Sequence, residues 1–375
     1  MEIYVKNVKF GDCSLIYEDK DFLLIDCGSC NAGGVPKMKR GKFAYSQIAS
    51  DIINNNNKMR NLMISHFDSD HFNGILEIPN TYRFDNTYLP YSIIDGHTIF
   101  SETIGLLLAI APNRSWGFQL SRQIVDLFIK LSKISKKITF VKRGDIINLG
   151  KEKINILWPE IEKIYPNMIS INDNLDIPVS LEWSNLIDSF SNAFDLYIVN
   201  LHLENAYSSR EYIIGFEQAY ENLLSAHNNF INGSNYLNNK DSIQKFCYAK
   251  YHKLIKSINA TSIICDCKEH FISLGDAPKE VIEYLKDDYN SIYNVVKIQH
   301  HATKKYYTKS TPNGKIYILS NGGYKNRKID NRFLLTNGEF ICTQKSSANI
   351  NCEYYCCTKT CYKSCKSINF CPIYC

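Results

Sequence analysis

The sequence predicts an α/β sandwich made of two strand-rich halves. Three observations support this prediction: the chain opens with a run of strands, strands and helices alternate up to residue 159, and strands resume at residue 259 after a polar, helical segment. Such alternation is typical of sheets whose faces are covered by helices. We therefore expect residues 1–159 and 259–332 to form one sandwich, with residues 160–258 inserted between them.

The first half begins as a β-meander. Three apolar stretches separated by turns at Gly11-Asp12 and Asp19-Lys20-Asp21 predict its strands: MEIYVKNVKF, CSLIYE and FLLIDCG. A helical stretch near residues 45–54 then precedes an apolar strand at 61–65. Leucine and isoleucine at helical spacing predict helices at 99–110 and 119–131, and residues 137–157 return to strand, turn and strand.

The insertion differs from both halves in composition. Residues 160–258 are rich in asparagine and serine, and their apolar spacing predicts helices near 211–227 and 242–258. Because this segment has no ligand cluster of its own, we expect it to overhang one side of the site and shape access to it. From residue 259 the second half is predicted to contain a helix at 278–287 and four strands: TSIICDC, HFISLGD, VVKIQHH and KIYILSN.

The last segment, residues 333–375, is a cysteine-rich tail that contains one predicted strand near 340–343. Of the 14 cysteines, eight lie in the last 34 residues, where a C-x3-C spacing recurs. This spacing is compatible with a thiolate site for zinc and equally with disulfide pairing. The other cysteines are scattered, which favours a cytosolic body over a secreted disulfide framework.

Composition excludes several classes of protein. Hydrophobic residues make up 45% and charged residues 22%, values that are typical of globular chains rather than disordered or collagen-like ones. The longest apolar run, Ile104 to Pro112, is far shorter than the roughly 20 residues that cross a bilayer. The N-terminus lacks the apolar core of a secretory signal. We therefore expect a cytoplasmic protein without a membrane span.

Basic residues cluster near the end of the second half. The net charge of +5 is too small to require a polyanionic partner, but nine lysines and arginines lie between residues 295 and 332 against the single acid Asp330. A solvated surface would explain such a segment by itself. Its position favours an anionic ligand, because Lys304 and Lys305 closely follow the histidine pair His300-His301.

The densest group of ligand-type residues lies in SHFDSDHFNG, directly after the predicted strand at 61–65. Here His66, Asp68, Asp70 and His71 fall within six residues. Divalent cations such as zinc bind imidazole nitrogen and carboxylate oxygen, and a tight loop after a strand brings such side chains together. A polar loop whose histidines hydrogen-bond to the acids is the structural alternative. The crowding favours a metal site.

The H-x-D-x-D-H pattern after LLIDCG resembles the motif of the metallo-β-lactamase fold family. Its second-position aspartate is similar to the branch that includes the hydrolase domain of bacterial competence (DNA-uptake) channel proteins. Further segments match this branch in order: GDCSLIYEDKDFLLIDCG, VKRGDIINLG, INILWP, NATSIIC, HFISLGDAPKE, VVKIQHHATK and IYILSNGG. The resemblance covers about residues 1–159 and 259–330. It implies a four-layer αβ/βα sandwich with the metals at the rim where the two sheets meet.

The resemblance also implies a ligand set. His66 and Asp68 would bind a first ion, Asp70 and His71 a second, and Asp276 would bridge both. Either His300 or His301 would complete the second site, and its strand-end position favours His300, with His301 behind the ligands. Asp26 would accept a hydrogen bond from a ligand histidine.

The first site is thinner than in most of the family, because Asn259 stands where a histidine is usual. We therefore expect one or two divalent ions, with zinc favoured over manganese. Histidines of the insertion, His202, His227 and His252, are alternative ligands.

The resemblance implies a hydrolase that attacks its substrate with a metal-activated water, oriented by Asp70 or Asp276. Lys304 and Lys305 favour a phosphodiesterase or nuclease acting on nucleic acid or a nucleotide phosphodiester. Two alternatives stay open at this stage: hydrolysis of esters, lactones or thioesters, and a non-catalytic module that binds metal or a partner.

Overall fold

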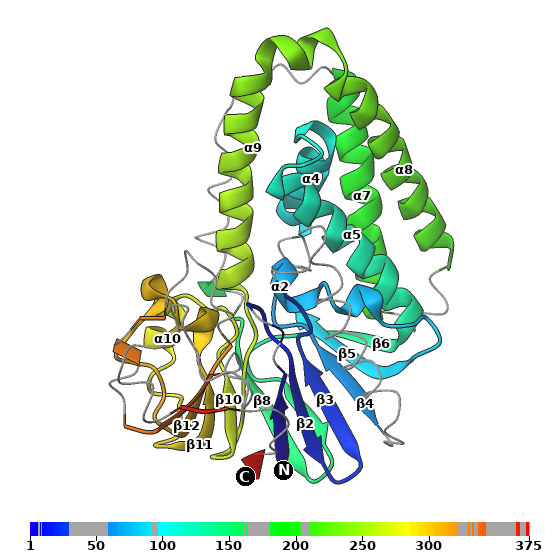
Figure 1. Ribbon diagram of the computed structural model, residues 1–375. Coiled ribbons are helices and arrows are strands. Elements are labelled where there is room, and N and C mark those ends of the chain that lie inside the picture. The colour runs from blue at the N-terminus through cyan, green and yellow to red at the C-terminus, as the bar shows by residue number, and fades with distance from the viewer. Residues whose placement is uncertain are drawn as a thin grey trace.

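The computed structural model describes residues 1–6, 8, 10–29, 59–91, 97–160, 162–163, 181–203, 210–320, 329–330, 332–333, 337–342, 365–367 and 373–374. In this part of the chain the strands form two mixed sheets (Figure 1). The first sheet contains, in spatial order, β15 (Ile373–Tyr374), β1 (Glu2–Val5), β2 (Ser14–Glu18), β3 (Asp21–Ile25), β4 (Arg60–Met63), β5 (Phe84–Pro90) and β6 (Ser135–Val141).

The second sheet contains, in spatial order, β14 (Cys365–Ser367), β13 (Glu339–Cys342), β12 (Gly314–Leu319), β11 (Tyr293–Lys297), β10 (Phe271–Ser273), β9 (Ile264–Cys267), β8 (Glu152–Trp158) and β7 (Ile146–Leu149). Each sheet has an antiparallel part and a parallel part. The strands β1, β2 and β3 are antiparallel, whereas β3 to β6 are parallel. Likewise β7 to β10 are antiparallel and β10 to β14 parallel.

Three apolar clusters separate the layers of the molecule. Strand β3 contributes side chains to two of these clusters, because side chains alternate between the faces of a sheet. Leu23 and Ile25 join the cluster between the two sheets, and Phe22 and Leu24 join the cluster under the helices. A third cluster packs α10 (Lys279–Tyr284) on the outer face of the second sheet. The molecule is an α/β sandwich, as predicted.

The insertion is helical and shares its core with the first half. Its helices are α7 (Leu181–Leu203), α8 (Arg210–Ile231) and α9 (Ser234–Ala260), and they pack on α4 (His97–Ile110) and α5 (Trp116–Ile134). Phe194 of α7 and Phe216 of α8 stack at 4.9 Å within the cluster that also contains Leu107 of α4. These helices gather at one end of the sandwich (Figure 1).

Most predicted elements are confirmed, with shifted ends. Helices α4 and α5 cover the predicted 99–110 and 119–131, and α9 continues two residues past the predicted boundary at 258. The helix predicted near 45–54 and the cysteine side chains of the tail lie outside the described residues. None of the described helices has the length and apolar character that crossing a membrane requires.

Candidate metal centre

The predicted ligands meet where strands of both sheets end. Strands β3 and β4 are parallel neighbours in the first sheet, and β10 and β11 are parallel neighbours in the second. The carboxyl ends of parallel neighbours lie at the same edge, so the residues that follow them are brought together. These residues are Asp26 after β3, His66 after β4, Asp276 after β10, and His300 and His301 after β11.

Asp276 lies at the centre of this group. Its carboxylate oxygens are 3.8 Å from Nε2 of His66, 3.3 Å from Nε2 of His71 and 2.6 Å from Nδ1 of His300. Nε2 of His301 is 3.9 Å away. Ligand-type residues from both halves of the sequence therefore converge on the aspartate that was expected to bridge the ions.

Four buried residues form the tightest part of the centre: Asp12, His71, Asp276 and His301. One ligand atom from each lies within 4.8 Å of all the others. Asp70 is next to this group, because its Oδ2 is 3.3 Å from Nε2 of His301. A cation placed among these atoms would have imidazole and carboxylate ligands from four separate segments of the chain.

Several atoms in the centre are buried without a hydrogen-bond partner. Among the described residues this holds for Nε2 of His66, Nε2 of His71 and Oδ1 of Asp276. Buried polar atoms nearly always have a hydrogen-bond partner, so three buried atoms without one in the same place require an explanation. A divalent cation supplies one, because imidazole nitrogen and carboxylate oxygen are its ordinary ligands. The residues present fit a metal ion.

Hydrogen bonds to Nδ1, on the side away from the centre, orient the rings of two candidate ligand histidines, His71 and His301. Asp26 accepts a hydrogen bond from Nδ1 of His71 at 2.8 Å, and it also accepts bonds from the amide and hydroxyl of Ser65. Nδ1 of His301 donates to the carbonyl oxygen of Ser320 at 3.0 Å. Both contacts leave Nε2 to face the centre, which is the usual arrangement behind a metal-bound histidine. The expected role of Asp26 matches this geometry.

The chain turns sharply after β11, in a conformation that L-residues rarely adopt. His300, His301 and Ala302 have φ values of 44°, 55° and 61°, all in the left-handed region. Each such residue costs about 1–3 kcal/mol, and such strain is concentrated at functional sites. The turn gives the two histidines different surroundings: His301 contacts Asp70, and His300 contacts the cavity.

Burial and neighbouring charges set the protonation of the histidines. Burial, with the charge of His71, lowers the pKa of His66 to about 3, so this imidazole is neutral at pH 7. Burial would also lower the pKa of His71 and of His301, but the carboxylate of Asp276 and its neighbours outweigh it and raise both. Loss of solvent and the charge of Asp70 raise the pKa of Asp68 to about 7.

The two adjacent histidines take positions different from the expected ones. The tight group contains His301, whereas strand-end position had favoured His300. Nδ1 of His300 is occupied by Asp276, and its ring stacks on Tyr306 with 3.7 Å between the centroids. Asn259, at the end of α9, donates a hydrogen bond to the hydroxyl of Tyr306 at 3.1 Å. Asn259, Tyr306 and His300 are therefore in contact with one another.

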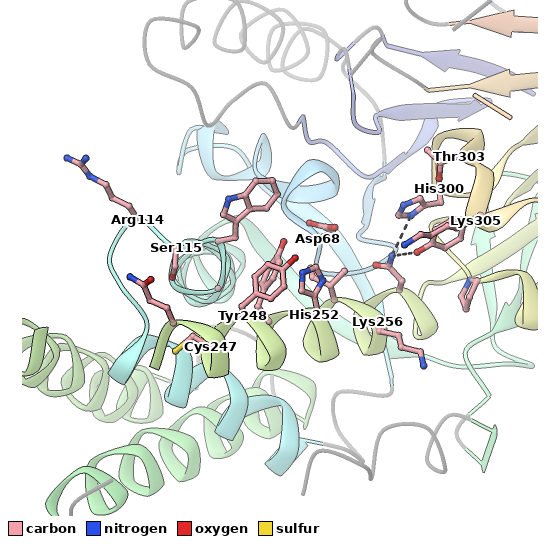
Figure 2. Close-up of a pocket in the computed structure, with 18 of the residues that line it drawn as sticks. Asp68, Arg114, Ser115, Cys247, Tyr248, His252, Lys256, His300, Thr303 and Lys305 are labelled. Atoms are coloured by element: carbon pink, nitrogen blue, oxygen red, sulfur yellow. Dashed lines mark hydrogen bonds between the residues drawn. The ribbon is translucent and has the colours of Figure 1, made fainter. Parts of the chain in front are cut away.

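A cavity of about 1360 Å³ opens beside the centre, and Asp68, Asn259 and His300 line it. Lys304 and Lys305, which the sequence suggested for substrate binding, line the same cavity. The opposite wall is formed by α9 of the insertion and by the start of α5. Figure 2 shows His252 and Tyr248 projecting from α9 toward Asp68. The insertion therefore borders the site on the metal side, as expected.

Not every sequence candidate lies at the centre. His227 is buried away from it, where Nδ1 hydrogen-bonds to the carbonyl oxygen of Ala109, and His202 contacts the rings of Tyr91 and Phe140. The predicted basic patch loses one member, because Lys297 is buried and its Nζ lies 3.1 Å from Oδ2 of Asp12. This ion pair neutralises a carboxylate inside the protein.

Asp12 and Lys297 are the residues that sequence reasoning did not assign to the centre. Asp12 stands alone in the turn before a strand, and Lys297 was counted with the basic patch. The available signal was the polar residue in each apolar stretch: Asp12 before CSLIYE, and Lys297 within VVKIQ.

No protein-family model matches the chain, and a search of curated proteins finds no match.

Proposed function

We propose that this protein is a metal-dependent hydrolase with a metallo-β-lactamase-like sandwich. The observation that carries the proposal is the convergence of buried imidazole and carboxylate groups from both halves of the chain around Asp276. Three features support a catalytic rather than a purely structural site. The ligands are oriented from behind, the chain is strained at the histidine pair, and a large cavity reaches the centre.

In the proposed site one cation would be held by Asp12, His71, His301 and Asp276, with Asp70 at its edge. His66 and Asp68, together with Asp276, would form a second, weaker site. Asn259 contributes no imidazole there, which leaves this second site with fewer ligands. Zinc is favoured over manganese because histidine nitrogens supply much of the ligand set.

The residues of the chain divide the chemistry between them. A cation, when bound, would supply a Lewis acid that polarises the substrate and lowers the pKa of a water. The carboxylate of Asp70 or of Asp276 would accept the proton of the attacking water. His300 is held by Asp276 and Tyr306 with part of its ring at the cavity, so it contacts the leaving group or the substrate beside it.

A phosphodiester is the substrate class that the cavity favours. Its charged lining residues are Asp68 and the cations Arg114, Lys256, Lys304 and Lys305. Phosphoryl transfer depends mainly on positioning and charge neutralisation, which such a lining provides. Neutral esters, lactones and thioesters do not require four cations.

The test combines metal content with turnover. Elemental analysis of the purified protein should find zinc or a similar divalent ion, and the loaded protein should hydrolyse bis(p-nitrophenyl) phosphate faster than p-nitrophenyl acetate. Asp276→Asn should lose more than the about 10- to 100-fold that is typical of changes behind a metal ligand. Asp188→Asn, on the exposed side of α7, is the matched control. Turnover of neither substrate by the zinc-loaded protein would refute the proposal.

A further inference from the structure

Two large aromatic side chains in the cavity wall are exposed to an unusual degree. Trp116, at the start of α5, is 66% exposed, and Tyr248, on α9, is 67% exposed. Both line the cavity that reaches the metal centre. Burial of an aromatic ring is strongly favourable, so exposure of two of them in one cavity indicates a surface that contacts something else.

Local structure holds these rings in place. The hydroxyl of Ser115 accepts a hydrogen bond from the amide of Phe118 and caps α5, which fixes Trp116 at the first position of the helix. The ring of Trp116 meets Tyr251 edge-to-face at 6.3 Å. On α9, Tyr248 meets His252 edge-to-face at 4.2 Å. The spacing of 248, 251 and 252 places these three side chains on one face of α9.

We define the aromatic shelf as Trp116, Tyr248, Tyr251 and His252. All four residues line the cavity. In Figure 2, Tyr248 and His252 of the shelf lie across from Lys305 and His300, and Asp68 lies between them. The same cavity therefore offers flat ring surfaces on the wall formed by α5 and α9, and the cations Lys304 and Lys305 on the other wall. A ligand that matches both walls has planar rings and a negatively charged backbone.

We propose that the cavity binds single-stranded nucleic acid, with one or two bases stacked on the aromatic shelf and the phosphates along Lys304 and Lys305. The direction of the strand, toward the metal centre, rests on the proposed function. Stacking on aromatic side chains and cationic contact with the backbone are how proteins bind single strands without reading their sequence. Bases in a duplex are stacked on one another, so their faces are closed to the shelf.

Binding is measured on the full chain with fluorescein-labelled dT10 and rU10, by anisotropy in the presence of EDTA. We expect binding of at least one strand and much weaker binding of a labelled duplex of equal length. Trp116→Ala and Tyr248→Ala should each weaken binding by about 5- to 150-fold, the range for loss of one base stack. Tyr212→Ala, an exposed tyrosine of α8 outside the cavity lining, should change nothing.

The arms of this experiment separate the two proposals. If the shelf variants bind both strands as well as the unchanged protein does, or if the duplex binds as tightly as the single strands, the shelf inference is wrong. Hydrolysis of bis(p-nitrophenyl) phosphate would still support the proposed function. Conversely, single-strand binding that depends on the shelf, without hydrolysis of any phosphodiester, would support the shelf inference and contradict the proposed hydrolase function. The dT10 and rU10 arms distinguish DNA from RNA.

Discussion

At the scale of single residues, two of the proposed ligand histidines favour the protonated form. The pKa of His71 is raised well above its usual value and that of His301 is also raised, so both imidazoles hold a proton more readily than an ordinary histidine when no cation is bound. His66 is already neutral. Because only the neutral imidazole binds a cation, metal binding releases protons, and apparent affinity rises with pH.

Calorimetric titration of the metal-free protein with zinc at pH 7, in buffers of different ionisation enthalpy, should detect the release of protons as the ion binds. Asp26→Asn should reduce the number of protons released, because the Asp26 carboxylate is one cause of the raised pKa of His71. Asp188→Asn should leave it unchanged. Heats that are independent of the buffer would show that these histidines are neutral before zinc arrives.

At the scale of elements, three loops are joined by their backbones. The amide of Asp12 donates to the carbonyl of Asp70 at 3.1 Å, and the amide of Cys27 donates to the carbonyl of His71 at 2.7 Å. The amide of Gly28 donates to the carbonyl of Asp12 at 3.0 Å. Gly28 permits this approach, because a Cβ there would overlap the backbone of Asp70 and His71.

Gly28→Ala should therefore displace the loop that carries Asp70 and His71. We expect an unfolding free energy lower by about 1–3 kcal/mol, as for other overpacked sites, and zinc affinity lower by about 10- to 100-fold. Gly215→Ala in α8 is the control, because a Cβ there meets nothing within 4 Å. It should stabilise by about 0.5–1 kcal/mol. Equal stability and zinc affinity in Gly28→Ala and the unchanged protein would contradict the close approach.

At the scale of the whole molecule, the insertion is a part of the core rather than an attached lid. Phe190, Phe194 and Phe216 are fully buried in one cluster with Leu107 of α4 and with side chains of the first sheet. Removing the insertion would expose this cluster. The cost is of the order of 3–5 kcal/mol for each large aromatic side chain lost from a core.

Replacing residues 181–257 with a short glycine-serine linker should thus give an insoluble or unfolded chain, even though the linker leaves Asn259 and every proposed ligand in place. Soluble yield and far-ultraviolet circular dichroism, compared with the full chain prepared in parallel, provide the measurement. A folded, zinc-binding protein without the insertion would show that the sandwich is independent of these helices.

Local patterns in the sequence predicted the α/β sandwich and the loop that carries four ligand-type residues, whereas Asp276 and the histidine pair were expected only from the family resemblance. His66, Asp68, Asp70 and His71 are adjacent in the chain, and a strand ends just before them. Asp12 and Lys297 were not assigned, because they are far apart in sequence and meet only through the packing of the two sheets. The exchange of His300 and His301 depends on three consecutive left-handed residues, which no periodicity encodes.

The backbone bonds between the loops have a consequence for how the protein is supplied with metal. The loops are held to each other by amides and carbonyls, so folding and loading are separate equilibria. Small zinc domains, in contrast, fold only when the ion binds. An ion can therefore leave and return without refolding of the chain. If the proposed function holds, the loaded fraction would follow the free concentration of the cation in the surroundings, and activity would follow metal supply without any change in the amount of protein.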